Sequence, residues 1–195
     1  MNLYEVFAEI LDYPNAQQAV CIQDCDARLT RESPESAELL QRFQASKESV
    51  RLGRLQEAYT SIFDMQPECT LNLGYQLFGD DWRRSIFLFK LKEIYQANAF
   101  DTGCELPDHL CILLRFLAAR DGTNEASELV DDCLIPTLSR MAGSVQLAES
   151  SYRWVLKALL LWLQKKREVR GPGCESGDQD PANGVAIAAV EERLA

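Results

Sequence analysis

Apolar residues recur along most of the chain at intervals of three and four, the period of a helix that buries one face. The first such stripe runs from Leu3 to Leu11 and stops before Tyr13-Pro14, since the residue before a proline disfavours the helical conformation. Ser33-Pro34 is typical of a helix start, with a capping oxygen and then a proline in the first turn. Further stripes cover residues 39–43, 52–63, 87–94, 110–117, 126–134 and 155–162. The pattern predicts helix over most of the chain.

Two places interrupt this pattern. Apolar residues alternate over 70–78, which is a strand period. No second segment of comparable quality exists to pair with it, and an isolated strand leaves its backbone groups unsatisfied. We therefore expect residues 70–78 to be helical or irregular. Pro136 follows the 126–134 stripe and is expected to kink or split that helix.

The chain shows no repeat at a fixed period, which argues against a solenoid. Gly171-Pro172-Gly173 ends the last long stripe, and the residues after it are small, polar and acidic. We expect a single all-α domain, a bundle of about seven to nine helices, over residues 1–170. Residues 171–195 are predicted to be a flexible acidic tail, in which 185–194 could form one short helix.

Composition narrows the classes of partner. The 195 residues carry a formal charge of −10, so the surface repels nucleic acid and attracts basic partners such as basic peptides, unless the charge serves only solubility. The most apolar window, residues 154–163, contains a lysine and is far shorter than the roughly 20 residues that cross a bilayer. The N-terminus lacks the basic region of a secretory signal. We expect a cytoplasmic protein that is not embedded in a membrane.

The chain has seven cysteines, an odd number without a CxxC pair, and a single histidine. Cys21 and Cys25 are four residues apart and could share a helix face, but the ligands for a metal site are too few. Free, buried cysteines in a reducing compartment are the expected state. We expect no metal and no cofactor.

The search for catalytic patterns finds no glycine-rich phosphate loop, no GxSxG and no HExxH. His109 and Cys111 are two residues apart and would point to different sides of a helix. An enzyme that uses His109 and Asp108 as acid and base would still lack a nucleophile, a phosphate cradle and a metal shell. The adjacent Asp80-Asp81 is typical of a helix cap in a solvated turn. The sequence therefore predicts a protein without catalytic activity.

Two stretches stand out, although each alone is ordinary helix punctuation. Residues 55–67 contain Tyr59, Phe63-Asp64 and Pro67, and residues 105–110 read Glu-Leu-Pro-Asp-His-Leu. They occur in order with Leu11-Asp12-Tyr13-Pro14, Leu77-Phe78-Gly79-Asp80-Asp81 and the downstream Leu114, Phe116 and Leu117. This ordered set, over about residues 3–165, resembles the nitrate reductase delta-subunit (NarJ) chaperones within the wider TorD-like family of redox-enzyme maturation proteins.

The resemblance implies an all-helical, non-catalytic chaperone without a cofactor of its own. Its partner would be the catalytic molybdenum subunit of a molybdopterin-dependent oxidoreductase, bound through its N-terminal leader. Binding would assist molybdenum-cofactor insertion and delay membrane docking or twin-arginine export. A nitrate reductase is the first choice of client; oxidoreductases acting on selenate, chlorate, dimethyl sulfide or hydrocarbons are alternatives. Monomer and dimer both stay open. The rival interpretation is a generic helical adaptor that binds another basic partner.

The resemblance also assigns client-binding roles to eight residues of this chain: Tyr59, Phe63, Asp64, Gly79, Asp80, Pro107, Asp108 and His109. Tyr59 and Phe63 lie on a helical stripe, so they could be core instead. Asp108 and His109 lie beside a helix start and are expected to be exposed. Segments 64–81 and 101–114 contain acids and no lysine or arginine. If they meet in space, they would form an acidic rim around an apolar groove that includes Leu106.

Overall fold

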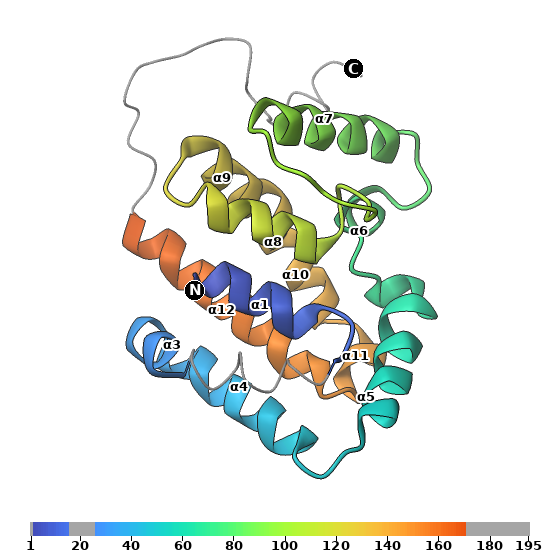
Figure 1. Ribbon diagram of the computed structural model, residues 1–195, viewed down its shortest axis with the longest axis vertical. Helices are drawn as coiled ribbons and strands as arrows, with labels where there is room; N and C mark the ends of the chain where they lie inside the picture. The colour runs from blue at the N-terminus through green and yellow to red at the C-terminus, as the bar shows by residue number, and fades with distance from the viewer. Residues whose placement is uncertain (1, 16–25, 171–195) are drawn as a thin grey trace.

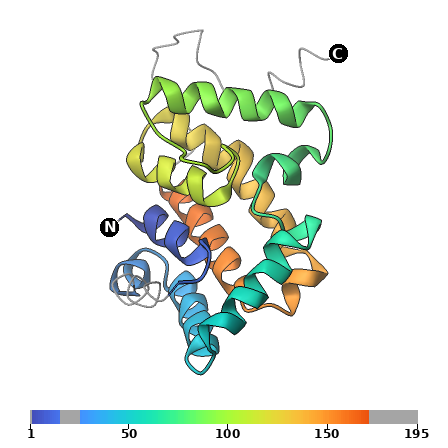
Figure 2. The same cartoon turned by 45° about the vertical axis from the view of Figure 1, so that its right-hand side comes forward.

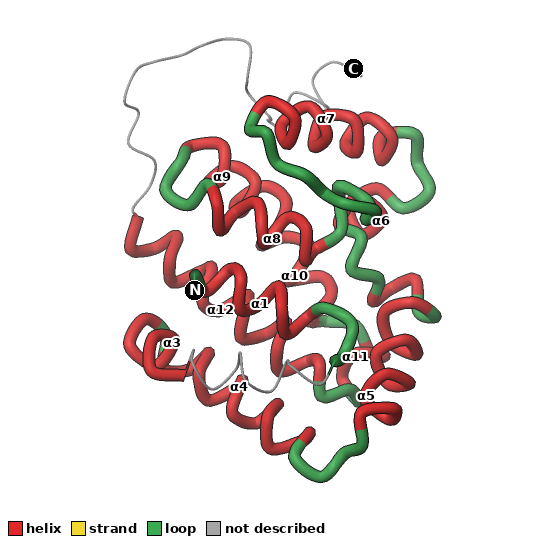
Figure 3. The backbone as a smooth tube through the Cα atoms, in the orientation of Figure 1, coloured by secondary structure: helices red, strands yellow, loops and turns green. Residues whose placement is uncertain are grey.

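The computed structural model describes residues 2–15 and 26–170 of the chain (Figure 1). Within these ranges the regular structure is helical, and the one extended pairing is an isolated bridge between Asn72 and His109 (Figure 3). The α-helices are α1 (Leu3–Leu11), α3 (Asp26–Glu32), α4 (Pro34–Lys47), α5 (Leu52–Tyr59), α6 (Leu73–Phe78), α7 (Arg83–Ala97), α8 (Leu110–Ala119), α9 (Asn124–Glu128), α10 (Ile135–Ala142), α11 (Val145–Ala148) and α12 (Tyr152–Arg170). The other helical turns are the π-helices η1 (Thr60–Asp64) and η3 (Leu129–Leu134) and the 3₁₀-helix η2 (Pro67–Cys69).

The predicted all-α architecture is confirmed. Nine helices form within the described residues when continuous runs are counted once and the short η2 and α11 are left aside. This number lies within the predicted range. The predicted tail at 171–195, and the predictions for Cys21, Cys25 and Cys174, lie outside the described residues.

Helix α12 forms the centre of the bundle (Figure 1). It packs against α4 and α10, and α1 lies against both α12 and α8. Aromatic rings fill the contact between α1 and α12, where Trp162 lies 4.8 Å from the ring of Tyr4 and 5.7 Å from that of Phe7. Helix α7, at the opposite end of the molecule from α4, is joined to the bundle through α6 and its own buried residues Phe87, Leu91 and Tyr95 (Figure 2).

Local chemistry explains where the helices begin. The Asn2 side chain accepts a hydrogen bond from the Tyr4 backbone N–H, and Glu5 accepts one from the Asn2 N–H, so α1 starts with a capping box. Ser33-Pro34 starts α4 as predicted, although the Ser33 hydroxyl bonds to Ser36 and not to a backbone N–H. The capping box of α1 thus satisfies backbone donors at the helix start that the helix cannot satisfy by itself.

Of the two interruptions in the sequence pattern, residues 70–78 form as expected, whereas Pro136 does not split its helix. Residues 70–78 form no strand; they lead from η2 through the bridge at Asn72 into α6. Pro136 occupies the first turn of α10, directly after the π-helix η3. A proline cannot donate the backbone bond that a helix interior needs. The run from α9 to α10 changes from the α to the π pattern at Leu129 and returns to the α pattern at Ile135, next to the proline, and it stays continuous.

Cysteines follow the prediction with one exception. Cys69, Cys111 and Cys133 are free and buried, whereas Cys104 is free and exposed. The expectation of burial was wrong for Cys104, which lies in the exposed stretch 103–106 of the connection between α7 and α8. Burial raises the pKa of the Cys111 and Cys133 thiols, so both are held as thiols.

None of the helices in the described ranges is long and apolar enough to cross a bilayer. The same ranges contain no cluster of three or more metal-ligating side chains.

Candidate functional site

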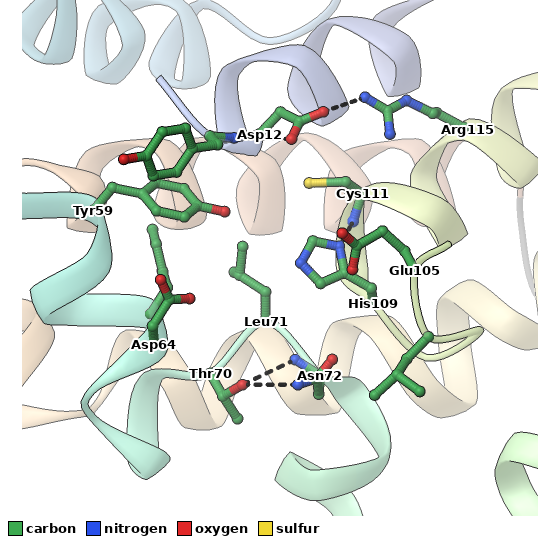
Figure 4. Close-up of a pocket in the computed structure, with 13 residues that line it drawn as sticks. Asp12, Tyr59, Asp64, Thr70, Leu71, Asn72, Glu105, His109, Cys111 and Arg115 are labelled. Carbon is green, nitrogen blue, oxygen red and sulfur yellow. Dashed lines mark hydrogen bonds and ion pairs between the residues drawn. The ribbon is translucent and has the colours of Figure 1, made fainter. Parts of the chain in front are cut away.

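A cavity of about 450 Å³ lies between the end of α1, the α5–η1 helix and the connection that leads into α8 (Figure 4). It is lined by 13 residues. They are Asp12, Tyr13, Tyr59, Phe63, Asp64, Thr70, Leu71, Asn72, Glu105, Leu106, His109, Cys111 and Arg115. The cavity thus brings together two of the stretches that the sequence singled out, residues 55–67 and 105–110.

One wall of the cavity is aromatic. The ring of Tyr59 lies 5.5 Å from that of Tyr13 and 4.9 Å from that of Phe63, both edge to face. Tyr152 of α12 supports Tyr59 and Phe63 from behind, at 5.7 and 5.0 Å. The Tyr59 hydroxyl donates a hydrogen bond to the Leu11 carbonyl at 3.0 Å. Tyr59 and Phe63 are therefore core residues that also form part of the cavity surface.

The charged residues of the cavity leave a negative surplus. Arg115 pairs with Asp12 and with Glu9 on α1, which neutralises the arginine. Asp64 and Glu105 are exposed at the cavity, and neither forms an ion pair with another described residue. A basic ligand would find two unneutralised carboxylates beside an apolar wall.

His109 lies at the N-terminus of α8. It was predicted to be exposed, but its side chain is half-buried. Its Nδ1 accepts a hydrogen bond from the Cys111 backbone N–H at 3.3 Å, so the side chain caps the helix. Burial lowers the pKa of His109, and the nearby carboxylates of Glu105, Asp12 and Asp108 oppose that shift. The imidazole is accordingly neutral near pH 7 and does not cancel the carboxylates of the cavity.

This lowered pKa predicts a pH dependence of stability. The unfolded chain binds the His109 proton more readily than the folded chain does, so the free energy of unfolding should decrease as pH falls through 6.5, the ordinary pKa. His109→Asn keeps a capping acceptor without a titratable group. Urea unfolding of both proteins between about pH 5 and pH 8 should show a shallower decrease for the variant. An equally steep decrease in H109N would contradict the assignment, because all other titrating groups are common to both proteins.

Asp108 is fully buried, so the prediction of an exposed carboxylate was wrong. Its Oδ2 accepts a hydrogen bond from the Gly74 N–H at 3.1 Å and lies 3.7 Å from Nε of Arg84. A Cβ placed on Gly74 would lie 2.8 Å from this Oδ2, so only glycine permits the approach. Burial raises the pKa of Asp108, while Arg84 and the Gly74 N–H oppose that rise. The side chain therefore ties the start of α6 to the α7–α8 connection and does not line the cavity.

Backbone pairing reinforces the same junction. The Leu73 N–H donates to the Asp108 carbonyl and the Leu110 N–H to the Leu71 carbonyl, both at 2.8 Å. The Pro107 carbonyl accepts a hydrogen bond from the Tyr95 hydroxyl at 2.9 Å. Pro107 thus anchors the connection to α7 and does not line the cavity.

Gly79 and Asp80 also lie outside the cavity. Gly79 follows α6 with φ of +64°, a conformation that residues with a Cβ rarely adopt, and its N–H donates to the Tyr75 carbonyl. Asp80 is exposed in the following turn. The neighbouring Asp81 accepts from the Arg83 backbone N–H at 2.9 Å and pairs with the Arg83 side chain, as a cap does. Arg84, the next residue, reaches the buried Asp108 and not this turn.

The structure therefore gathers four of the eight predicted residues, Tyr59, Phe63, Asp64 and His109, at one cavity together with Leu106. The acidic rim is smaller than predicted, because only Asp64 and Glu105 of the two acidic segments reach it. Sequence reasoning missed Asp12, Tyr13 and Arg115. Arg115 interrupts an otherwise apolar helix stripe. A cation in such a position needs a carboxylate partner. The sequence could therefore have predicted a pair between Arg115 and a carboxylate such as Asp12.

Comparison with known proteins identifies the family of the chain. The family model described as "Nitrate reductase delta subunit" matches residues 26–141. The chain is also 27% identical over 157 residues to the probable nitrate reductase molybdenum cofactor assembly chaperone NarJ of Bacillus subtilis (strain 168). That alignment covers 80% of this chain and 84% of the relative. The matched residues include η1, α6 and the Glu105–Leu110 segment, so the chain belongs to the nitrate reductase delta subunit family.

Proposed function

We propose that this protein is a cytoplasmic assembly chaperone for the catalytic subunit of a molybdopterin-dependent oxidoreductase, a nitrate reductase in the first instance. It binds the N-terminal segment of that subunit in the cavity of Tyr59, Asp64 and Glu105. The observation that carries the proposal is this cavity, where an aromatic wall faces two unneutralised carboxylates in a member of the delta subunit family.

The chemistry of the cavity suits an amphipathic, basic helix. Tyr13, Tyr59 and Leu106 offer apolar contact to its hydrophobic face. Asp64 and Glu105 lie at positions where they would meet lysine or arginine side chains. Rim charges of this kind mainly accelerate association and select the partner, whereas the buried aromatic contacts slow dissociation.

The geometry of the polar residues favours binding over catalysis. The Cys111 thiol is buried with a raised pKa, which is the reverse of what a nucleophile requires. The Asp108 carboxylate contacts Gly74 and Arg84, so it does not form an acid–base pair with His109 in the cavity. The chaperone name of the Bacillus subtilis relative points the same way.

Two further steps belong to the proposal. By holding the N-terminal segment, the chaperone would keep the client open for insertion of the molybdenum cofactor. It would also delay membrane docking or twin-arginine export until insertion is complete. The chaperone itself carries no cofactor in this scheme.

Calorimetric titration tests the proposal. The titrant is a synthetic peptide of about the first 40 residues of the catalytic subunit encoded next to the gene for this protein. That length contains a complete helix with flanks. We expect saturable binding with micromolar or lower Kd. Asp64→Asn with Glu105→Gln should weaken it roughly fivefold to tenfold and reduce its salt dependence.

The matched control neutralises two exposed acids away from the cavity, Glu93→Gln with Glu149→Gln. This variant has the same net charge as D64N/E105Q, so it separates local contacts from the overall field. Failure of the peptide to bind the wild-type chain would refute the leader-binding role. Equal binding of unrelated basic helices would favour the rival, a generic helical adaptor.

A further inference from the structure

The cavity described above does not end at residues 64–72. A smaller hollow of about 210 Å³ shares Asp64, Thr70 and Asn72 with it. That hollow in turn shares Pro67 and Tyr75 with a larger cavity of about 750 Å³. Because neighbouring hollows share lining residues, the three adjoin one another in a row, as a groove that runs from the first cavity past the η1–η2 turn to the corner between α10 and α11.

The far cavity lies between two helical segments. One wall is the end of α6, where Leu77 and Phe78 are half-buried and precede Gly79. The opposite wall is the α10–α11 corner, which includes Ser139 and Arg140. In Figure 2 the α6 segment and the α10–α11 corner lie on the same side of the molecule as α5 and η1.

Buried hydrogen bonds hold these walls in place. The Gln76 side-chain amide is buried and donates to the carbonyls of Glu68 and Thr70, at 3.0 and 3.1 Å. The Arg140 guanidinium donates to the Gln76 backbone carbonyl. The η2 turn, α6 and α10 are thereby joined, so this part of the groove is preformed. A preformed site lowers the entropic cost of binding.

Charge along the groove continues the pattern of the first cavity. Asp64 and Glu68 are exposed along its edge, and no ion pair with a described residue neutralises either of them. Arg84, at the intermediate hollow, is opposed by the buried Asp108 carboxylate. Arg140 also lines the far cavity, where it donates to the Gln76 carbonyl and adds one positive charge. The acids along the hollows are therefore Asp64 and Glu68, and Pro67, Tyr75, Leu77 and Phe78 give the far cavity its apolar surface.

We propose that the far cavity is a second subsite for the same client segment, which takes an apolar side chain while Glu68 meets a neighbouring basic residue. This inference rests on the proposed function, because it assigns the rest of the groove to the peptide in the first cavity. Gly79, one of the eight residues predicted to bind the client, lines this far cavity and not the first one. The adjoining hollows and the exposed carboxylates of Asp64 and Glu68 beside them favour this occupant.

The test compares two substitutions in the full chain, Ser139→Trp and Ser85→Trp. Both serines are exposed. Ser139 lines the far cavity, whereas Ser85 on α7 lines none of the described hollows. The indole at position 139 would fill the subsite without altering the first cavity. Thermal melting confirms that both variants fold.

Each variant is titrated with the leader peptide of about 40 residues and with its two halves of about 20 residues. We expect S139W to weaken binding of the long peptide roughly tenfold, which is about what the burial of one apolar side chain contributes to affinity. S139W should not alter binding of the half-peptide whose affinity is reduced by D64N/E105Q. S85W should not alter binding of the long peptide or of that half-peptide. Unaltered binding of the long peptide to S139W would overturn the second subsite while leaving the proposed function intact. Absence of binding to wild type by every peptide would overturn both.

Discussion

Replacing Asp108 by alanine is expected to lower the free energy of unfolding by about 2–4 kcal/mol. The change removes the carboxylate that faces Arg84 and accepts from the Gly74 N–H, and it leaves both groups without that partner. The value lies below that of a completely buried ion pair because Arg84 keeps 24% of its side chain exposed. Urea unfolding monitored by circular dichroism measures the difference.

Two further variants separate the contributions at this junction. Asp108→Asn keeps an acceptor for the Gly74 N–H and loses the charge, so it should cost less than alanine. Gly74→Ala should destabilise the fold through a different route, since its Cβ would lie 2.8 Å from the Asp108 Oδ2. If D108A unfolds within about 0.5 kcal/mol of wild type, as most surface substitutions do, the structural role given to Asp108 is wrong.

Tyr59→Ala is expected to destabilise the protein by about 3–5 kcal/mol, the range for large aromatic residues in a core. Tyr59 is only 5% exposed, and its ring contacts those of Tyr13, Phe63 and Tyr152. The substitution also leaves the Leu11 carbonyl without the Tyr59 hydroxyl. Chemical denaturation gives the stability, and the m-value shows whether two-state unfolding persists.

Tyr59→Phe is the matched variant, because it removes the hydroxyl and keeps the ring. It should cost only about 1 kcal/mol. If Tyr59 also contacts the client, Y59F should bind the leader peptide almost as well as wild type does. Y59A, at a temperature where it is still folded, should bind much more weakly. Equal loss of stability in both variants would show that the hydroxyl and not the ring dominates, contrary to this expectation.

Sequence patterns located the helices well because helix formation depends on neighbours three and four residues away. The period of apolar residues, the capping residues and the prolines are all local signals, and they correctly indicated α1 and the start of α4. The same patterns placed Tyr59 and Phe63 on a buried stripe. They could not show that the stripe also forms one wall of a cavity.

The errors concern side chains whose partners are distant in sequence. Asp108 lies beside a helix start, where a carboxylate is usually exposed, yet Gly74 and Arg84 enclose it from another part of the chain. Arg84 likewise pairs with Asp108 and not with the acids of its own turn. Asp12 and Arg115 are 103 positions apart, and only the packing of α1 on α8 brings them together.

The sequence by itself determined the helical class, most helix boundaries and the family resemblance, since each depends on local periodicity or on an ordered set of motifs. Only the tertiary structure decided which motif residues line a cavity and which hold the fold together. The Glu105–Leu110 segment contains both kinds: Glu105, Leu106 and His109 border the cavity, whereas Asp108 is turned into the protein. That division depends on which groups surround each side chain, and residues from distant parts of the chain supply those groups.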